Sequence, residues 1–100
     1  MRSVNRLTVL GNVGSITVFD NVLKVSVATA RTFKQDGERR EKTDWVPVTI
    51  FEPGMREWVE ENVKKGDKVY VEARVSQSSY GEGDNKKYTV DVVASLFNKL

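Results

Sequence analysis

The stretch "TDWVPVTIFEPG", residues 43–54, is the most informative part of the sequence for predicting the fold. Side chains of a β-strand point alternately to its two faces, and this stretch alternates in that way, so we predict a strand over residues 44–51. One face carries the aliphatic Val46, Val48 and Ile50, which is typical of a strand that covers a core. The opposite face would point away from that core, and it carries Trp45, Pro47, Thr49 and Phe51. Two large aromatics on that outer face need an explanation other than the core.

The same alternation continues on both sides of this strand and predicts four further extended segments. They are "VNRLTVLGNV" and "ITVFDNVLKVSVATARTF" before it, and "KVYVEARVSQSSY" and "KYTVDVVASLF" after it. The chain is expected to turn at Asp20-Asn21 and at Asp36-Gly37, because these residues favour tight turns. The alternating side chains, interpreted as the inward-facing set, are Leu7, Val9, Leu23, Val25, Val27, Val69, Val71, Ala73, Val75, Tyr88, Val90 and Val92.

One helix is predicted between the third and fourth strands, within "EPGMREWVEENVKKGD". It would bury an apolar stripe at helical spacing, made of Met55, Trp58, Val59 and Val63. We therefore interpret Trp58 as a core or lid residue and not as a ligand contact. Pro53 precedes the helix, and Gly66 suits the C′ position that ends it.

The order of these elements, three strands, a helix and two strands, predicts the fold class. In a short all-β chain we expect a closed five-stranded Greek-key barrel with the helix covering one end, which is the OB-fold. A small split barrel without the helix and an open α+β sheet are the competing architectures. The chain has 100 residues, which suits one domain over residues 1–100. One face of an OB-fold and its neighbouring loops commonly bind oligonucleotides or oligosaccharides.

The composition removes most catalytic and metal chemistry. Without cysteine, neither disulfide bonds nor thiolate zinc sites can form, and without histidine the usual general base and metal ligand are missing. We therefore expect no enzyme activity, no cofactor and no metal. No apolar run approaches the roughly 20 residues of a membrane-spanning helix, and the N-terminus lacks the anatomy of a signal peptide. A soluble protein of the cytoplasm is the expectation.

The distribution of charge is more informative than the net charge of +2. Basic residues cluster within residues 31–42, around the predicted turn, whereas an acidic group lies within residues 57–61. Aromatic side chains are interleaved with the cations. This mixture suits single-stranded nucleic acid, because rings stack on unpaired bases while Arg and Lys neutralise phosphates. A solvated charged face and aromatics buried in a subunit interface are the alternatives. Carbohydrate binding would usually add several fixed carboxylates or amides beside the rings.

Segments along nearly the whole chain resemble the bacterial-type single-stranded DNA-binding protein family (SSB). They are "VNRLTVLGNVG", "KVSVATARTF", "TDWVPVTIF", "VKKGDKVYVEARV" and "KKYTVDVVA", in the family's order. The most specific parts are the Thr-acidic-Trp strand that ends in Phe and the Lys-Gly-x-x-Val-Tyr-Val-Glu run. The resemblance implies an OB-fold that binds and protects single-stranded DNA (ssDNA), without sequence preference, in replication, recombination and repair. It also implies a nucleoid-associated homotetramer of a bacterial or phage-infected cell, with a dimer as the alternative.

The resemblance further assigns the base-stacking positions. Here they are Trp45 and Phe51 of the third strand, Phe33 before the basic turn, and Tyr80 at the end of the fourth strand. Phe33 shares its parity with the inward-facing Val25 and Val27, so it must leave the core face by a bend or a bulge. From their location alone, the residues predicted to contact phosphates are Arg6, Arg31, Lys42, Arg56, Arg74, Lys86 and Lys87.

The sequence also departs from the family pattern. Val46 stands where well-known members have a histidine that takes part in subunit contacts, which leaves tetramer and dimer open. Pro47 lacks an N–H, so it must lie at an edge or at a gap in the ladder. The connection between the first two strands is short and lacks the family's Asp-Pro-Glu segment. The chain stops at "SLFNKL", where cellular members continue into a disordered linker and an acidic tip. We expect a chain without that tip, trimmed or naturally tailless, not to recruit the partners that bind it.

Three other functions compete with sequence-independent ssDNA binding. A primosome-type accessory protein would use the same fold, usually as a dimer, to bridge ssDNA and replication proteins, although the Thr-Asp-Trp strand favours SSB. In a protein-interaction module the aromatic face would be an interface. RNA competes with DNA as the ligand, because no residue can be assigned to the 2′-OH. A small nuclease would need a metal motif that is not recognisable among its available carboxylates, Asp44, Glu52, Glu72 and Asp91.

Overall fold

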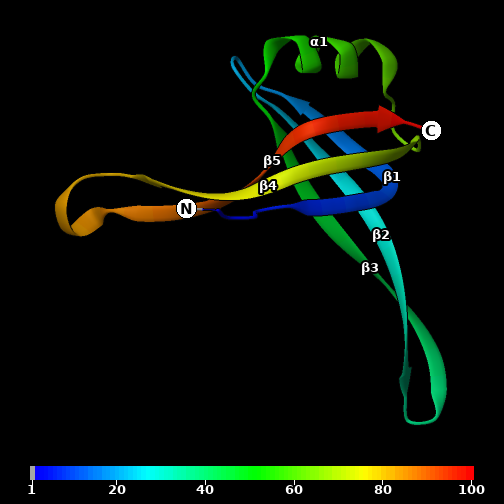
Figure 1. Cartoon of the computed structure of the whole chain (residues 1–100). Coiled ribbons are helices and arrows are strands. Elements are labelled where there is room, and N and C mark those ends of the chain that lie inside the picture. Colours follow the sequence, from blue (N-terminus) through cyan, green and yellow to red (C-terminus); the bar gives the residue numbers. More distant parts are fainter. Residues whose placement is uncertain (1) are drawn as a thin grey trace.

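The computed structural model of the chain describes residues 2–100. Its five strands are β1 (Leu7–Val18), β2 (Leu23–Gln35), β3 (Glu38–Ile50), β4 (Lys68–Tyr80) and β5 (Lys87–Lys99). The helix α1 (Pro53–Asn62) lies between β3 and β4, and a short 3-10 helix, η1 (Gly83–Asn85), lies between β4 and β5. The strands close into a barrel in the order β1-β2-β3-β5-β4, with α1 over one end (Figure 1). The predicted all-β barrel with a helix between its third and fourth strands is confirmed.

The barrel closes through one short parallel contact. β3 and β5 pair in parallel at Val48↔Val92 and Thr49↔Val93, whereas the other neighbouring strands pair antiparallel. Pro47 lies one residue before this parallel ladder begins, so its missing N–H falls outside it. This position agrees with the expectation of an edge or a ladder gap for the proline.

Valines fill most of the barrel interior. Inward-facing side chains from all five strands meet the buried side of α1, and removing this apolar surface from water stabilises the closed barrel. The buried cluster consists of Val9, Val13, Leu23, Val25, Val27, Val48, Ile50, Val59, Val63, Val69, Val71, Ala73, Ala94 and Phe97.

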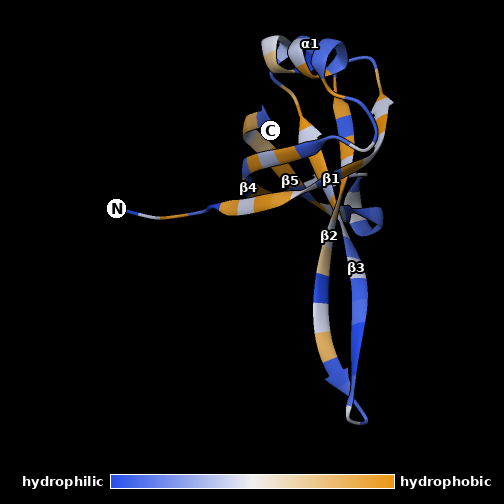
Figure 2. Cartoon of the chain, turned by 90° about the vertical axis from the view of Figure 1, so that its right-hand side faces the viewer, coloured by the Kyte–Doolittle hydropathy of each residue, from blue (hydrophilic) through white to orange (hydrophobic). Residues whose placement is uncertain are grey.

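Two hairpins extend beyond this core. The β2–β3 and β4–β5 hairpins leave the barrel in different directions (Figure 1), and hydrophilic residues follow the distal part of β3 (Figure 2). Side chains on these arms have no interior to fill, so alternation no longer separates core from surface there. Val75, Tyr88 and Val90 were predicted to face inward, and this prediction is wrong, because all three lie on the β4–β5 arm and are exposed.

The third strand is longer than predicted. It begins at Glu38, not at residue 44, and it ends at Ile50, so Phe51 follows the strand. The added residues belong to the β2–β3 arm. Thr49, which alternation places on the outer face, is only 4% exposed, because it lies between β2 and β5 where the barrel closes.

The β2–β3 ladder is continuous, from Leu23↔Ile50 to Gln35↔Glu38. The predicted turn lies at its end, with Asp36 and Gly37 both at positive φ. The bulge considered for Phe33 is therefore not present, and this part of the prediction is wrong. Phe33 leaves the core because the whole hairpin projects past the barrel.

The N-terminus of α1 is capped by a carboxylate. Glu52 accepts hydrogen bonds from the backbone N–H of Gly54 at 3.0 Å and of Met55 at 2.6 Å. These bonds satisfy donors that have no partner inside the helix. Because they stabilise the charged form, they lower the pKa of Glu52 below its ordinary 4.5.

The helix ends earlier than predicted. Its last residue is Asn62 and its C-cap is Val63, so the prediction of Gly66 at C′ is wrong. Gly66 has a φ of 95° and lies in the turn that follows. There the carboxylate of Asp67 accepts a hydrogen bond from the backbone N–H of Lys64 at 2.8 Å, and this bond lowers the pKa of Asp67.

One side of α1 covers the barrel. Val59 and Val63 are buried and Met55 packs against the core, as the apolar stripe predicted. Trp58 is 39% exposed and lies outside the buried cluster, so of its two predicted places, core or lid, the core is wrong. The helix is short and only partly apolar, and within residues 2–100 no helix could cross a membrane.

Candidate nucleic-acid interface

Cross-strand pairing aligns the outward side chains of β1, β2 and β3 in rows, and we call this surface the outer face. Trp45 of β3 lies beside Ala28 of β2, and in the next row Pro47 lies beside Ser26. Directly opposed residues share a face of the sheet. Because its neighbours on β2 are small, the indole stays uncovered, and Trp45 is 59% exposed.

The indole of Trp45 lies against β1 at Gly14. A Cβ at Gly14 would collide with Cζ3 of the indole, and Cε3 and Cη2 would both be 3.2 Å from it. Gly14 falls where the β1–β2 register shifts, between Val13 and Ser15. The irregular backbone and the missing side chain together let the ring approach the sheet closely.

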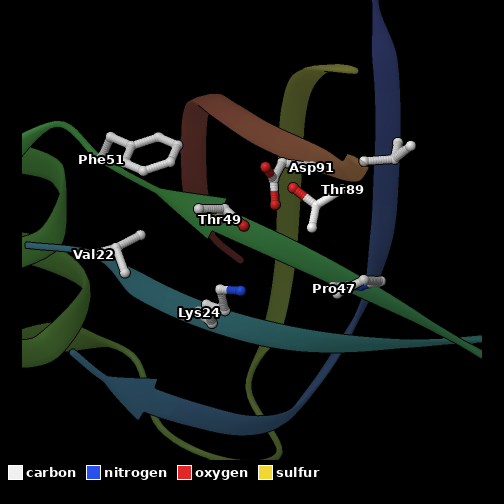
Figure 3. Close-up of a pocket in the computed structure, with 8 residues that line it drawn as sticks. Val22, Lys24, Pro47, Thr49, Phe51, Thr89 and Asp91 are labelled. Carbon is white, nitrogen blue, oxygen red and sulfur yellow. The ribbon is translucent and has the colours of Figure 1, made fainter. Parts of the chain in front are cut away.

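Phe51 lies at the other end of the outer face. Alternation puts it on the same side as Trp45, about 20 Å further along the strand direction. Phe51 is 51% exposed and borders an open hollow of about 500 Å³. The residues that line this hollow are Val22, Lys24, Pro47, Thr49, Phe51, Thr89, Val90 and Asp91 (Figure 3).

The hollow is mainly neutral, with one cation and one carboxylate. Lys24 reaches it from β2, and Asp91 reaches it from β5 (Figure 3). Within residues 2–100, Lys24 forms no ion pair closer than 4.0 Å. The sequence analysis missed Lys24 as a candidate, although the burial expected for Leu23 and Val25 already turns Lys24 outward.

The β2–β3 arm carries Phe33 on its other face. Phe33 and Arg31 are on the side of the ribbon opposite to Trp45, and Arg31 pairs with Lys42. The guanidinium of Arg31 is 5.4 Å from the ring centroid of Phe33, and its Nε also bonds the Asp44 carboxylate at 2.8 Å. Phe33 therefore does not lie beside Trp45. Its neighbours are the basic residues Arg31 and Arg40. A smaller hollow of about 260 Å³ there is lined by Thr32, Phe33, Lys34 and Arg39.

The β4–β5 arm continues the face that carries the larger hollow. Tyr80 is exposed at the end of β4 and pairs with Lys87. The next pair on that side is Ser78 and Thr89, whose hydroxyls are 3.0 Å apart, and Thr89 borders the hollow. Because residues two apart share a face of a strand, Tyr80, Lys87 and Arg74 lie on the side of Thr89.

The remaining basic candidates lie on separate elements, and none borders either hollow. Arg6 precedes β1 and lies near Tyr70, whose hydroxyl donates to Glu72 at 3.1 Å. That hydrogen bond raises the pKa of Tyr70 above its ordinary 10.0. Lys86 follows η1 at the tip of the β4–β5 arm. Arg56 lies on α1, and its Nε is buried without a hydrogen-bond partner among the described residues.

The carboxylates considered for a nuclease are not gathered. Asp44 pairs with Arg31, Glu52 caps α1, and Glu72 accepts from Tyr70. In the part of the chain that the structure describes, no three His, Cys, Asp or Glu side chains form a metal-binding group.

Comparison with known proteins bears on this interface. The model of the single-strand binding protein family matches residues 4–100. The chain belongs to this family. A single-stranded DNA-binding protein of Rhizobium meliloti is 34% identical over 105 residues, which cover 96% of this chain and 60% of the relative. A Rickettsia felis protein of the same name is 33% identical, over 96% of this chain and 69% of the relative. The chain thus spans about two thirds of the length of these family members.

Solved structures of proteins named as single-stranded DNA-binding share the fold. The structure described as "Plasmodium falciparum SSB complex with ssDNA" aligns over 100% of this chain and 97% of its own, with a TM-score of 0.78 at 22% identity. A mitochondrial single-stranded DNA-binding protein of S. cerevisiae aligns over 99% and 97%, with a TM-score of 0.69 at 27% identity. The family resemblance and the OB-fold predicted from the sequence are both confirmed.

Proposed function

We propose that this chain binds ssDNA without sequence preference and protects it during replication, recombination and repair. The observation that carries the proposal is the division of β3: Val48 and Ile50 are fully buried, while Trp45 and Phe51 are more than half exposed on the opposite side. Unpaired bases present π-faces to water, and aromatic rings can replace their lost stacking at about 1–3 kcal/mol per base. The names of the Rhizobium and Rickettsia relatives support the same ligand.

Cations near the exposed aromatic side chains would neutralise the phosphates. Lys24, Arg74 and Lys87 share the side of the barrel that carries the larger hollow, and Arg31 and Lys42 lie on the β2–β3 arm. Each phosphate contact releases condensed counterions, which favours binding at low salt. Arg6, Arg56 and Lys86 border neither hollow, and their contacts with phosphates remain predictions.

The two arms would extend the path of the strand. Phe33 on the β2–β3 arm and Tyr80 on the β4–β5 arm are each placed beside a basic residue, Arg31 and Lys87 respectively. We propose both as further stacking residues, reached when ssDNA passes beyond the barrel. Residues 1–100 would then act as one ssDNA-binding domain, which binds its ligand and catalyses no reaction.

We further propose that the chain works as a homo-oligomer, with a tetramer expected and a dimer as the alternative. Leu10 of β1 and Leu96 of β5 are exposed and pair with Tyr70 and Glu72 of β4, so apolar side chains line an outward surface over β1, β4 and β5. Exposed apolar surface of this kind is typical of contacts between subunits. Sedimentation equilibrium should give the mass of an oligomer, and Leu10→Glu should lower it.

The ligand is tested by fluorescence anisotropy with an end-labelled oligo-dT. We expect saturable binding to oligo-dT and other unpaired sequences, and much weaker binding to a duplex of equal length, because paired bases are already stacked. Equal affinity for duplex and single strand, or no binding to either, would overturn the proposed function. A matched oligo-U measures the preference between DNA and RNA.

A further inference from the structure

The β1–β2 hairpin ends in an aromatic residue that the proposed function does not use. Its last strand pair is Val18↔Leu23, and the Phe19 N–H then donates to the carbonyl of Val22 at 2.9 Å. The connection is therefore tight, with its backbone held at the first turn residue. Phe19 is 49% exposed at this fixed point of the fold.

Strand register places Phe19 in line with Phe51. Extending the β1–β2 pairing by one residue sets Phe19 opposite Val22, and extending the β2–β3 pairing by one residue sets Val22 opposite Phe51. Neighbouring strands are about 5 Å apart, so the two phenylalanines are about 10 Å apart across the sheet. Val22 and Phe51 border the same hollow (Figure 3).

Lys24 lies close to both Phe19 and the hollow. Its Nζ is 5.9 Å from the ring centroid of Phe19, and Lys24 also lines the hollow beside Phe51. The ring thus lies beside a cation that also lines the hollow, although Phe19 itself is not among the lining residues. An aromatic face next to an ammonium group suits a nucleotide, since the ring can stack on the base while the cation meets a phosphate.

We propose that Phe19 is a further base-stacking residue and that Lys24 contacts a phosphate next to that base. The bound strand would then cross from Phe51 over Val22 to the tip of the β1–β2 hairpin. This inference rests on the proposed function and adds one stacking position to it, at the tip of the β1–β2 hairpin, which the stacking residues proposed above do not reach.

The test compares Phe19→Ala with Val18→Ala by anisotropy with labelled oligo-dT. Val18 is an exposed apolar neighbour whose partner Leu23 faces the core, so it lies off the row and serves as the matched control. We expect Phe19→Ala to weaken binding at least about fivefold, the lower end of base stacking on an aromatic ring, with Val18→Ala near wild type. Phe19→Leu keeps apolar bulk without a ring and should also weaken binding, whereas Phe19→Trp should retain it.

A second ligand separates stacking from other effects. An oligomer of abasic deoxyribose phosphates offers phosphates without bases, so Phe19→Ala and wild type should bind it equally. The proposal is overturned if Phe19→Ala and Phe19→Leu bind oligo-dT like wild type, or if Phe19→Ala lowers the mass in solution, which would make Phe19 a subunit contact. In either case a loss of binding in Phe51→Ala would leave the proposed function standing. Failure of the wild-type chain to bind oligo-dT would overturn both.

Discussion

Gly11 and Gly14 of β1 show how the same missing Cβ serves two purposes. At Gly11 a Cβ would collide with the backbone carbonyl oxygen of Ala28 and come within 3.0 Å of Val27 Cγ1. At Gly14 it would meet only the indole of Trp45. Backbone cannot move aside cheaply, whereas an exposed ring can, so the first glycine matters for stability and the second for the position of a ring on the outer face.

We therefore predict that Gly14→Ala moves the indole and weakens oligo-dT binding by up to about 1–3 kcal/mol, the contribution of one stacked base. Its free energy of unfolding should stay near that of wild type. Gly11→Ala should instead lose about 1–3 kcal/mol of stability through overpacking. Urea unfolding gives the stability, and a Trp58→Phe background leaves Trp45 as the only tryptophan, so its emission reports the ring. Unchanged emission and affinity in Gly14→Ala would contradict the role assigned to this glycine.

The two faces of strand β3 have different roles, since one packs in the core and the other carries the exposed aromatics. Val48 is fully buried and opposes Val25 and Val92 inside the barrel. We predict that Val48→Ala lowers the free energy of unfolding by about 2 kcal/mol, through lost burial and a cavity. Affinity for oligo-dT per folded molecule should not change, because the outer face is untouched. Denaturant melts beside titrations measure both quantities, and a loss of affinity in the folded fraction would show that the two faces are not independent.

Glu52, which caps α1, and Asp67, at the turn after α1, should make the stability of the fold depend on pH in acid. Glu52 and Asp67 have pKa values below their ordinary 4.5 and 3.8, because Glu52 accepts two backbone hydrogen bonds and Asp67 accepts one. A group with a lowered folded-state pKa stabilises the fold above its unfolded value and loses that contribution as the pH falls through its folded value. Stability should therefore decline as the pH falls below the ordinary pKa values of these two groups.

Glu52→Gln and Asp67→Asn test this assignment. Each variant should be less stable than wild type at neutral pH, and its stability should converge with that of wild type in acid. Urea unfolding at a series of pH values measures the difference. Curves that stay parallel down to the lowest pH would show that these carboxylates do not contribute through their charge.

Alternation in the sequence predicts which side chains are buried only where one face of the strand covers the core. Alternation predicted the buried valines of β2, β3 and β4, and it placed Trp45 and Phe51 outside, because one face of each strand meets the barrel interior. The same rule failed for Val75, Tyr88 and Val90, since a hairpin arm can alternate without a core. The contact between Gly14 and Trp45 and the row from Phe19 to Phe51 depend on register between strands, which a single strand's pattern does not contain.

At the scale of the whole molecule, binding combines stacking with phosphate neutralisation. We predict that the logarithm of the association constant falls linearly with the logarithm of salt concentration, by about 0.7 for each phosphate contact. Lys24→Gln should lower this slope by about 0.7. Lys65→Gln, in the turn between α1 and β4, should leave it unchanged and serves as the control. Anisotropy titrations over a salt series give the slopes, and an affinity independent of salt would contradict the phosphate contribution.

The exposed aromatics of the outer face are tested most directly by the affinity of Phe51→Ala for labelled oligo-dT, measured per folded molecule. We predict a loss of about 1–3 kcal/mol, or about 5- to 150-fold, with a melting temperature near that of wild type. Phe51→Tyr keeps a ring and should bind nearly as well as wild type. If Phe51→Ala lowers the melting temperature while each folded molecule binds as tightly as before, the aromatic is structural, and base stacking on the outer face is contradicted.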